Sequence, residues 1–103
     1  MKDYTHTLLI GTNYSKFYVR NRLIRRLGTE APDRLQDNMI HVFKETFEYT
    51  CKTNLGKIVE WSDGAIESDS ALDERAIDLV FNQTIETVFT YEMLMHLTGG
   101  HLL

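Results

Sequence analysis

The prediction of the fold class depends most on residues 71–97, ALDERAIDLVFNQTIETVFTYEMLMHL. Apolar residues occupy more of its positions than a single stripe along a helix requires. Ser70 and Asp73 have the spacing of a capping box at its start, and Gly99-Gly100 ends the helical pattern. A helix that is apolar on most sides must be covered on most sides. The stretch therefore predicts a long central helix packed against other elements.

Another helix is predicted over residues 14–27, between a capping side chain at Asn13 and a helix-ending residue at Gly28. At 100° per residue, one side of this helix is apolar, with Val19 at its margin. The apolar set is Phe17, Leu23, Ile24 and Leu27. The opposite side, called the arginine face below, consists of Tyr18, Arg22, Arg25 and Arg26. The pattern predicts an amphipathic helix.

A third helix is predicted over residues 32–55. Pro32 suits the first helical position, because its missing amide donor would have no helical partner there. Apolar residues then recur at steps of three and four: Leu35, Met39, Val42, Phe43 and Phe47. The helix either ends near Gly56 or continues, bent, to Trp61, and the sequence leaves both alternatives open.

Residues 1–13 are expected to form an extended arm or a short strand before the helices. Residues 4–10 are apolar and β-branched enough for one strand. A lone strand would lie along the helices or pair with a second copy, because a single strand is not stable by itself. The predicted fold class is therefore all-α, with one domain over residues 1–103. It is an elongated bundle of three main helices, with a fourth short one if residues 56–61 form a separate turn.

The size and composition of the chain are those of an ordinary globular domain. Its 103 residues are 43% hydrophobic and 25% charged. One cysteine cannot form an internal disulfide. No stretch has the pattern of a signal peptide or the roughly 18 apolar residues of a membrane span. We therefore expect a cytoplasmic protein that makes no membrane contact.

Charge is distributed unevenly along the chain. The net charge is −4, yet residues 1–28 carry +5 and residues 29–103 carry −9. Arginine pairs with carboxylates and phosphates through its planar fork, and tyrosine adds a stacking surface, so the arginine face is the candidate partner-binding site. Three interpretations stay open: a solvated face balanced by the rest of the chain, a contact with an acidic protein or second copy, and a contact with nucleic acid.

No pattern in the sequence predicts a catalytic centre, a cofactor or a bound metal. His41 and Glu45 lie four residues apart, as do Glu92 and His96, but antiparallel helices would not bring these two pairs together. Cys51 falls on an apolar stripe, where a buried structural thiol is the expected role. The chain is therefore expected to be non-enzymatic.

The long helix over residues 71–97 is predicted to carry more apolar surface than two shorter helices can cover. The surplus lies toward its end and forms the candidate self-association surface: Phe89, Met93, Leu94, Met95 and Leu97. Uncovered apolar surface favours contact with a second copy. We therefore expect a homodimeric protein-binding adaptor, inhibitor or regulator. The alternative is a nucleic-acid-binding regulator that uses the arginine face.

Overall fold

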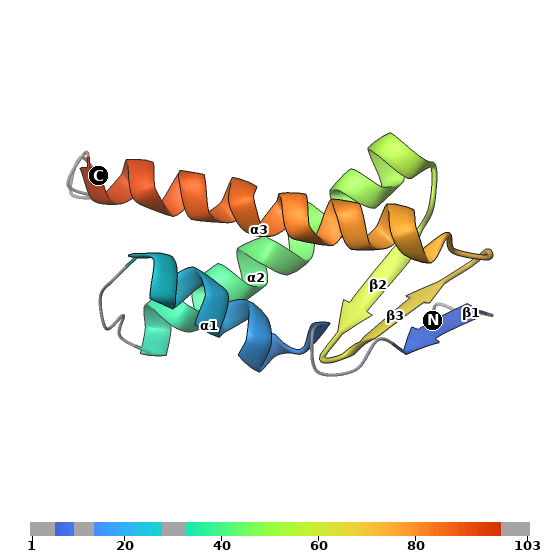
Figure 1. The fold of residues 1–103 in the computed structure, drawn as a ribbon, viewed down its shortest axis with the longest axis horizontal. Helices are drawn as coiled ribbons and strands as arrows, with labels where there is room; N and C mark the ends of the chain where they lie inside the picture. The colour runs from blue at the N-terminus through green and yellow to red at the C-terminus, as the bar shows by residue number, and fades with distance from the viewer. Residues whose placement is uncertain (1–5, 10–13, 28–32, 98–103) are drawn as a thin grey trace.

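The computed structural model describes residues 6–9, 14–27 and 33–97, and it describes side chains over 14–23 and 38–91. The elements follow in the order β1 (His6–Leu9), α1 (Lys16–Leu27), α2 (Asp33–Thr50), a π-helical turn (Cys51–Leu55), β2 (Val59–Ser62), β3 (Ala65–Ser68) and α3 (Glu74–Leu97). The three helices pack together, and the strands form a sheet at one end of the molecule, beside the start of α3 (Figure 1). The molecule measures 43 × 27 × 25 Å.

The prediction of an all-α fold is wrong, because the chain contains a three-stranded antiparallel sheet. The strand order is β1-β3-β2, so β3 is central. β1 pairs along its whole length with β3, from His6 opposite Ser68 to Leu9 opposite Ala65. The N-terminal segment was expected to lie along the helices or to pair with a second copy, but it finds its partner strand within the same chain.

The β2–β3 hairpin explains why a sheet forms here. Asp63-Gly64 is a two-residue turn between the paired residues Ser62 and Ala65, and Asp-Gly is among the strongest short hairpin signals. Gly64 has φ of 91°, a backbone conformation that glycine adopts without steric cost. Residues on the inner side of β2 are buried and those between them are more exposed. The hairpin gives β3 an edge for β1.

The end of α2 settles the alternative left open at Gly56. The helix closes with the π-helical turn Cys51–Leu55, and Gly56 follows in the left-handed conformation at φ 66°. The amides of Gly56 and Lys57 both donate to the carbonyl of Cys51, so the last turn is capped by backbone hydrogen bonds. The chain then enters β2 in extended form, and residues 56–61 form no further helix.

The predicted apolar side of α1 is correct at Leu23 and wrong at Phe17, and the side chains of Ile24 and Leu27 lie outside the described residues. Val19 and Leu23 are fully buried, whereas Phe17 is 64% exposed. The buried side therefore centres on Val19, which was placed at the margin, and Phe17 lies outside it. The cause is that α1 packs against both α2 and α3. These two contacts fix the rotation of the helix about its axis, and the apolar pattern of α1 alone does not.

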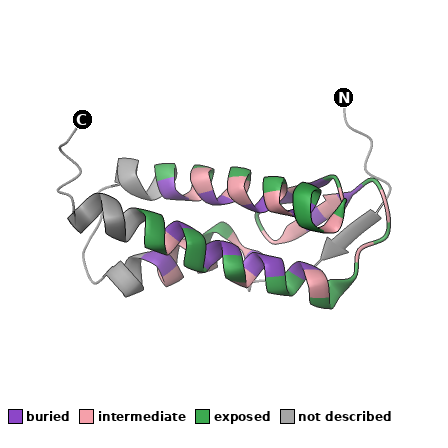
Figure 2. Ribbon diagram, turned by 90° about the horizontal axis from the view of Figure 1, so that it is seen from above, coloured by how far each residue is buried: buried purple, intermediate pink, exposed green. Residues whose placement is uncertain are grey.

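The core lies where the three helices meet the hairpin. Buried residues of the helices turn toward the middle of the molecule, and exposed ones lie along the outer sides (Figure 2). Aromatic rings dominate its centre: Tyr14, Phe43, Phe47, Trp61 and Phe81. The ring of Phe81 makes edge-to-face contacts with the other four, at centroid distances of 4.5 to 6.1 Å. Such pairs add stabilisation beyond the area they bury.

Within the described residues, no helix combines the length and apolar character that crossing a membrane requires.

Candidate binding surface on helix α1

The hairpin fixes the start of α1. The carbonyl of Tyr14 accepts hydrogen bonds from the indole Nε1 of Trp61 at 2.7 Å and from the amide of Gly64 at 3.1 Å. The carboxylate of Asp63 accepts a hydrogen bond from the amide of Lys16 at 2.9 Å. A carboxylate at a helix N-terminus pairs with otherwise unsatisfied amides and interacts favourably with the helix dipole. The first turn of α1 is thus held in place by residues some 47 positions away in sequence.

Tyr14 also ties α1 to α3. Its hydroxyl donates a hydrogen bond to the carboxylate of Asp78, and its ring packs edge-on against Phe81. Burial, together with this hydrogen bond and the negative charge of Asp78, raises the pKa of Tyr14 above its ordinary value. The phenol therefore stays protonated as a donor, and the position of α1 between the hairpin and α3 is determined from both sides.

With its buried side fixed, α1 presents an aromatic ring and two basic side chains away from the core. Phe17 is the exposed ring, Lys16 is exposed and Arg20 is half-buried. Lys16 and Arg20 lie four residues apart and therefore on the same side of the helix. We call these three residues the outer face of α1.

A cleft of about 340 Å³ lies beside this outer face, between α1 and α2. Its described lining carries four basic side chains, two apolar ones and no acidic one: Lys16, Arg20, Ile40, His41, Lys44 and Trp61. Trp61 is 1% exposed and belongs mainly to the core, so it forms the floor of the cleft. The cleft therefore has basic side chains on both walls and an apolar residue at its base.

Ion pairs hold the α2 side of the cleft. The Lys44 ammonium lies 2.5 Å from a carboxylate oxygen of Glu48, donates to the carbonyl of Trp61 at 2.9 Å and lies 3.9 Å from Glu60. The same Glu48 oxygen accepts the amide of Trp61 at 2.9 Å, which joins α2 to β2. The imidazole Nε2 of His41 lies 2.7 Å from Glu45, as expected for residues four apart on a helix.

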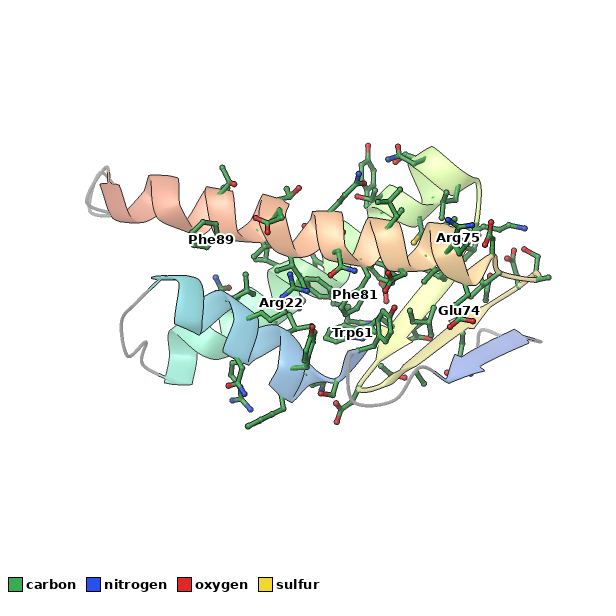
Figure 3. All side chains as sticks on the ribbon, in the orientation of Figure 1. Arg22, Trp61, Glu74, Arg75, Phe81 and Phe89 are labelled. Atoms are coloured by element: carbon green, nitrogen blue, oxygen red, sulfur yellow. The ribbon has the colours of Figure 1, made fainter. Side chains whose placement is uncertain are left out.

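The described part of the predicted arginine face, Tyr18 and Arg22, lies on the other flank of α1, where Arg22 reaches α3. Arg22 is half-buried and donates to the side-chain carbonyl of Asn82 at 2.6 Å, and its guanidinium carbon lies 5.6 Å from the centre of the Tyr18 ring (Figure 3). Arg25 and Arg26 belong to α1, but their side chains lie outside the described residues. Arg22 and Tyr18 are thus partly engaged within the molecule, and the cleft lies on the opposite flank.

The candidate self-association surface is described only at Phe89. Its ring is half-buried and packs against the core, so this residue is used at least in part within the chain (Figure 3). Met93, Leu94, Met95 and Leu97 belong to α3, but their side chains lie outside the described residues. Two other α3 side chains, Leu79 and Tyr91, are more than half exposed.

Cys51 is completely buried at the start of the π-helical turn, which confirms the predicted burial of this thiol. Burial, with a smaller contribution from the charge of Glu48, raises the pKa of the Cys51 thiol to about 12. A buried thiol that stays protonated is a poor nucleophile. Among the described side chains, no three His, Cys, Asp or Glu residues are grouped as a metal site would require.

Comparisons with protein families, with curated proteins and with solved structures find no match for this chain.

Sequence patterns missed most of this surface. The spacing of Lys16 and Arg20 is a signal for a second basic flank of the helix, but the three arginines on the other flank form a denser cluster. Phe17 was assigned to the core. His41 and Lys44 join the surface only through the packing of α2 against α1, for which the sequence contains no local signal.

Proposed function

We propose that this chain is a small non-enzymatic binding module that engages an acidic protein partner through the outer face of α1 and the adjoining cleft. The observation that supports this most strongly is the exposure of Phe17. At 64% exposure its ring contributes little to the core, and it stands beside the basic residues Lys16 and Arg20. Aromatic residues and arginine are the types most enriched where binding energy concentrates in protein interfaces.

The charge of the cleft supports an acidic partner. Lys16, Arg20 and Lys44 line it without an acidic residue in the described lining, although the whole chain carries −4. A local field of one sign governs contact and steers association more than net charge does. An acidic segment with an apolar residue would place carboxylates against the cleft and the apolar residue against Phe17.

Nucleic acid is the alternative partner, and the arginine face is the feature that favours it. Arg22 is already hydrogen-bonded to Asn82, which reduces what the described part of that face offers to phosphates. The overall negative charge also opposes a polyanion. We therefore place the protein partner first. Under this proposal the module works in the cytoplasm, where the reducing environment suits a free thiol such as Cys51.

The test is affinity capture with the chain as bait, from an extract of the organism that encodes it. Wild-type bait is compared with the double variant Lys16→Gln/Arg20→Gln, which removes two charges from the outer face. The matched control is Lys52→Gln/Arg75→Gln, because both residues are exposed and lie away from this cleft. We expect a protein that is retained by wild type and control and lost from the first variant.

Two further observations separate the alternatives. Capture that survives nuclease treatment identifies a protein as the direct partner. Capture that disappears with nuclease, with an affinity that falls steeply and linearly with salt on logarithmic axes, would identify nucleic acid and contradict the proposal. Equal capture by both double variants would also contradict it, since the outer face would then contribute nothing to binding.

A further inference from the structure

We propose that the cleft between α1 and α2 binds a phosphoryl group attached to an apolar body, namely a phosphorylated side chain of the protein partner. The inference rests on the proposed function and specifies the chemistry recognised at its centre. It follows from three features of the cleft: basic side chains on both walls, a fixed ammonium, and an apolar base.

Basic side chains approach the cleft from two helices. Lys16 and Arg20 line it from α1, and His41 and Lys44 line it from α2. A ligand in the cleft would therefore meet donors on opposite sides. A phosphoryl group has three acceptor oxygens arranged around a tetrahedron, so it can accept from both walls at once. The two oxygens of a carboxylate lie in one plane and are satisfied by a single arginine fork.

The charge of the two groups also favours a phosphoryl group over a carboxylate as the ligand. A phosphoryl group carries about −1.5 to −2 at pH 7, whereas a carboxylate carries −1. Each positive side chain of the cleft therefore interacts more strongly with the phosphoryl group. On the α2 wall, Glu48 and Glu60 lie beside Lys44 and offset part of this gain, so it comes mainly from Lys16 and Arg20 on the α1 wall.

The α2 wall is ordered before any ligand arrives. The Lys44 ammonium is held by Glu48 and by the carbonyl of Trp61, and the His41 imidazole is held by Glu45. An ammonium ion has three donors, and the Glu48 and Trp61 contacts are the close ones among the described residues. Binding then costs little additional side-chain entropy on this wall, which is the advantage of a preorganised site.

The apolar base suits the body that carries the phosphoryl group. Ile40 and Trp61 are the apolar residues of the described lining, and the volume of about 340 Å³ is at the lower end of the range for small-ligand pockets. A free inorganic phosphate would leave the apolar lining uncovered. A phosphorylated side chain would cover it with its own carbon atoms.

Phenyl phosphate is the probe, because it joins a phosphoryl group to an apolar ring. It is titrated into ¹⁵N-labelled protein at constant ionic strength and followed by the amide and indole signals. Trp61 is the single tryptophan, so its indole signal is unambiguous and reports from the floor of the cleft. Benzoate carries a carboxylate on the same ring, and inorganic phosphate lacks the ring.

We expect saturable shifts at Lys16, Arg20, His41 and Lys44 and at the Trp61 indole. Phenyl phosphate should bind at least fivefold more tightly than either benzoate or inorganic phosphate. Equal or tighter binding of benzoate, or shifts that do not centre on the cleft, would overturn the inference. A single-stranded oligonucleotide that saturates the same signals at lower concentration than phenyl phosphate would overturn its assignment to a protein side chain.

Variants test the walls of the cleft. Lys16→Gln/Arg20→Gln should weaken phenyl phosphate binding tenfold or more, whereas Lys52→Gln/Arg75→Gln should change it less than twofold. Arg20→Lys keeps the charge and should retain more of the affinity than Arg20→Gln. A preserved spectrum away from α1 shows that each variant remains folded, and equal affinities across the set would refute the role of this wall.

The failure of this inference can be distinguished from failure of the proposed function. If the captured partner depends on Lys16 and Arg20 but phenyl phosphate does not bind, the module binds its partner without a phosphoryl group. If phenyl phosphate binds in the cleft but the captured partner does not depend on these residues, the cleft is a ligand site and the partner surface lies elsewhere.

Discussion

Trp61→Phe is the substitution that best tests how the hairpin holds α1 in place. The indole Nε1 of Trp61 donates to the carbonyl of Tyr14 at 2.7 Å, and losing such a bond costs about 1 kcal/mol. The Tyr14 carbonyl keeps the amide of Gly64 as a donor, so no acceptor is left unsatisfied. The smaller ring also loses contacts with Phe43 and Phe81. This loss lowers the free energy of unfolding by about 1–2 kcal/mol more, a fraction of the full cost of truncating a buried tryptophan.

The expected loss of unfolding free energy for Trp61→Phe is therefore about 2–3 kcal/mol. In a domain of this size it corresponds to a fall in Tm of about 10–20 °C. Urea unfolding followed by far-ultraviolet circular dichroism measures it without relying on the tryptophan signal. Tyr49→Ala is the control, because Tyr49 is 68% exposed and should cost less than about 0.5 kcal/mol. A loss below about 1 kcal/mol for Trp61→Phe would refute the reasoning.

Three further predictions concern the arginine face, the thiol and assembly. The first prediction concerns a variant in which Gln replaces Arg22, Arg25 and Arg26. Its free energy of unfolding in urea should change by less than about 1 kcal/mol, because the described contact of these residues is a partly exposed side-chain pair. The Cys51 thiol should react slowly with thiol reagents in the folded protein. The free energy of unfolding should also fall as pH rises above about 9, because the thiol of the unfolded chain ionises near pH 9 while that of the folded chain keeps its proton to about pH 12. Rapid labelling of the native protein would contradict the burial of Cys51. We also expect the chain to self-associate at micromolar concentration through α3, and a light-scattering mass of 12.0 kDa at every concentration would show that it does not.

The helices could be located from the sequence because their ends are marked by local signals. The helix predicted over residues 32–55 corresponds to α2 and its π-helical turn, between Pro32 and Gly56. The helix predicted over 71–97 corresponds to α3, which begins at Glu74. Capping residues, prolines and glycines act within a few positions of the backbone they constrain, so a single sequence contains this information.

The sheet could not be located with the same rules because its strands are only four residues long. Ser62-Asp63-Gly64 is a turn signal in the sequence, but the four-residue strands on either side of it give no comparable signal. Four residues give two inward positions per strand, Val59 and Trp61 in β2, which is too few for a periodic pattern to stand out. The pairing of β1 with β3 joins segments about 60 residues apart, and no local rule specifies such a pairing.

The candidate binding surface could not be located from the sequence for a related reason. The rotation of α1 is set by packing on two helices and by the hydrogen bonds between Tyr14 and the hairpin, which place Phe17 outside and Val19 inside. A helical wheel of α1 contains no information about these tertiary contacts. The exposed ring and the basic cleft are therefore properties of the tertiary structure.

The most direct test of the account is the effect of Phe17→Ala on the Kd for the captured protein partner, measured beside Tyr49→Ala. The two rings are almost equally exposed, at 64% and 68%, but only Phe17 belongs to the outer face of α1. We predict that Phe17→Ala raises the Kd tenfold or more, as the loss of an interface anchor does, while Tyr49→Ala changes it less than twofold. Equal Kd values for Phe17→Ala and wild type would contradict the claim that α1 is the binding surface of this protein.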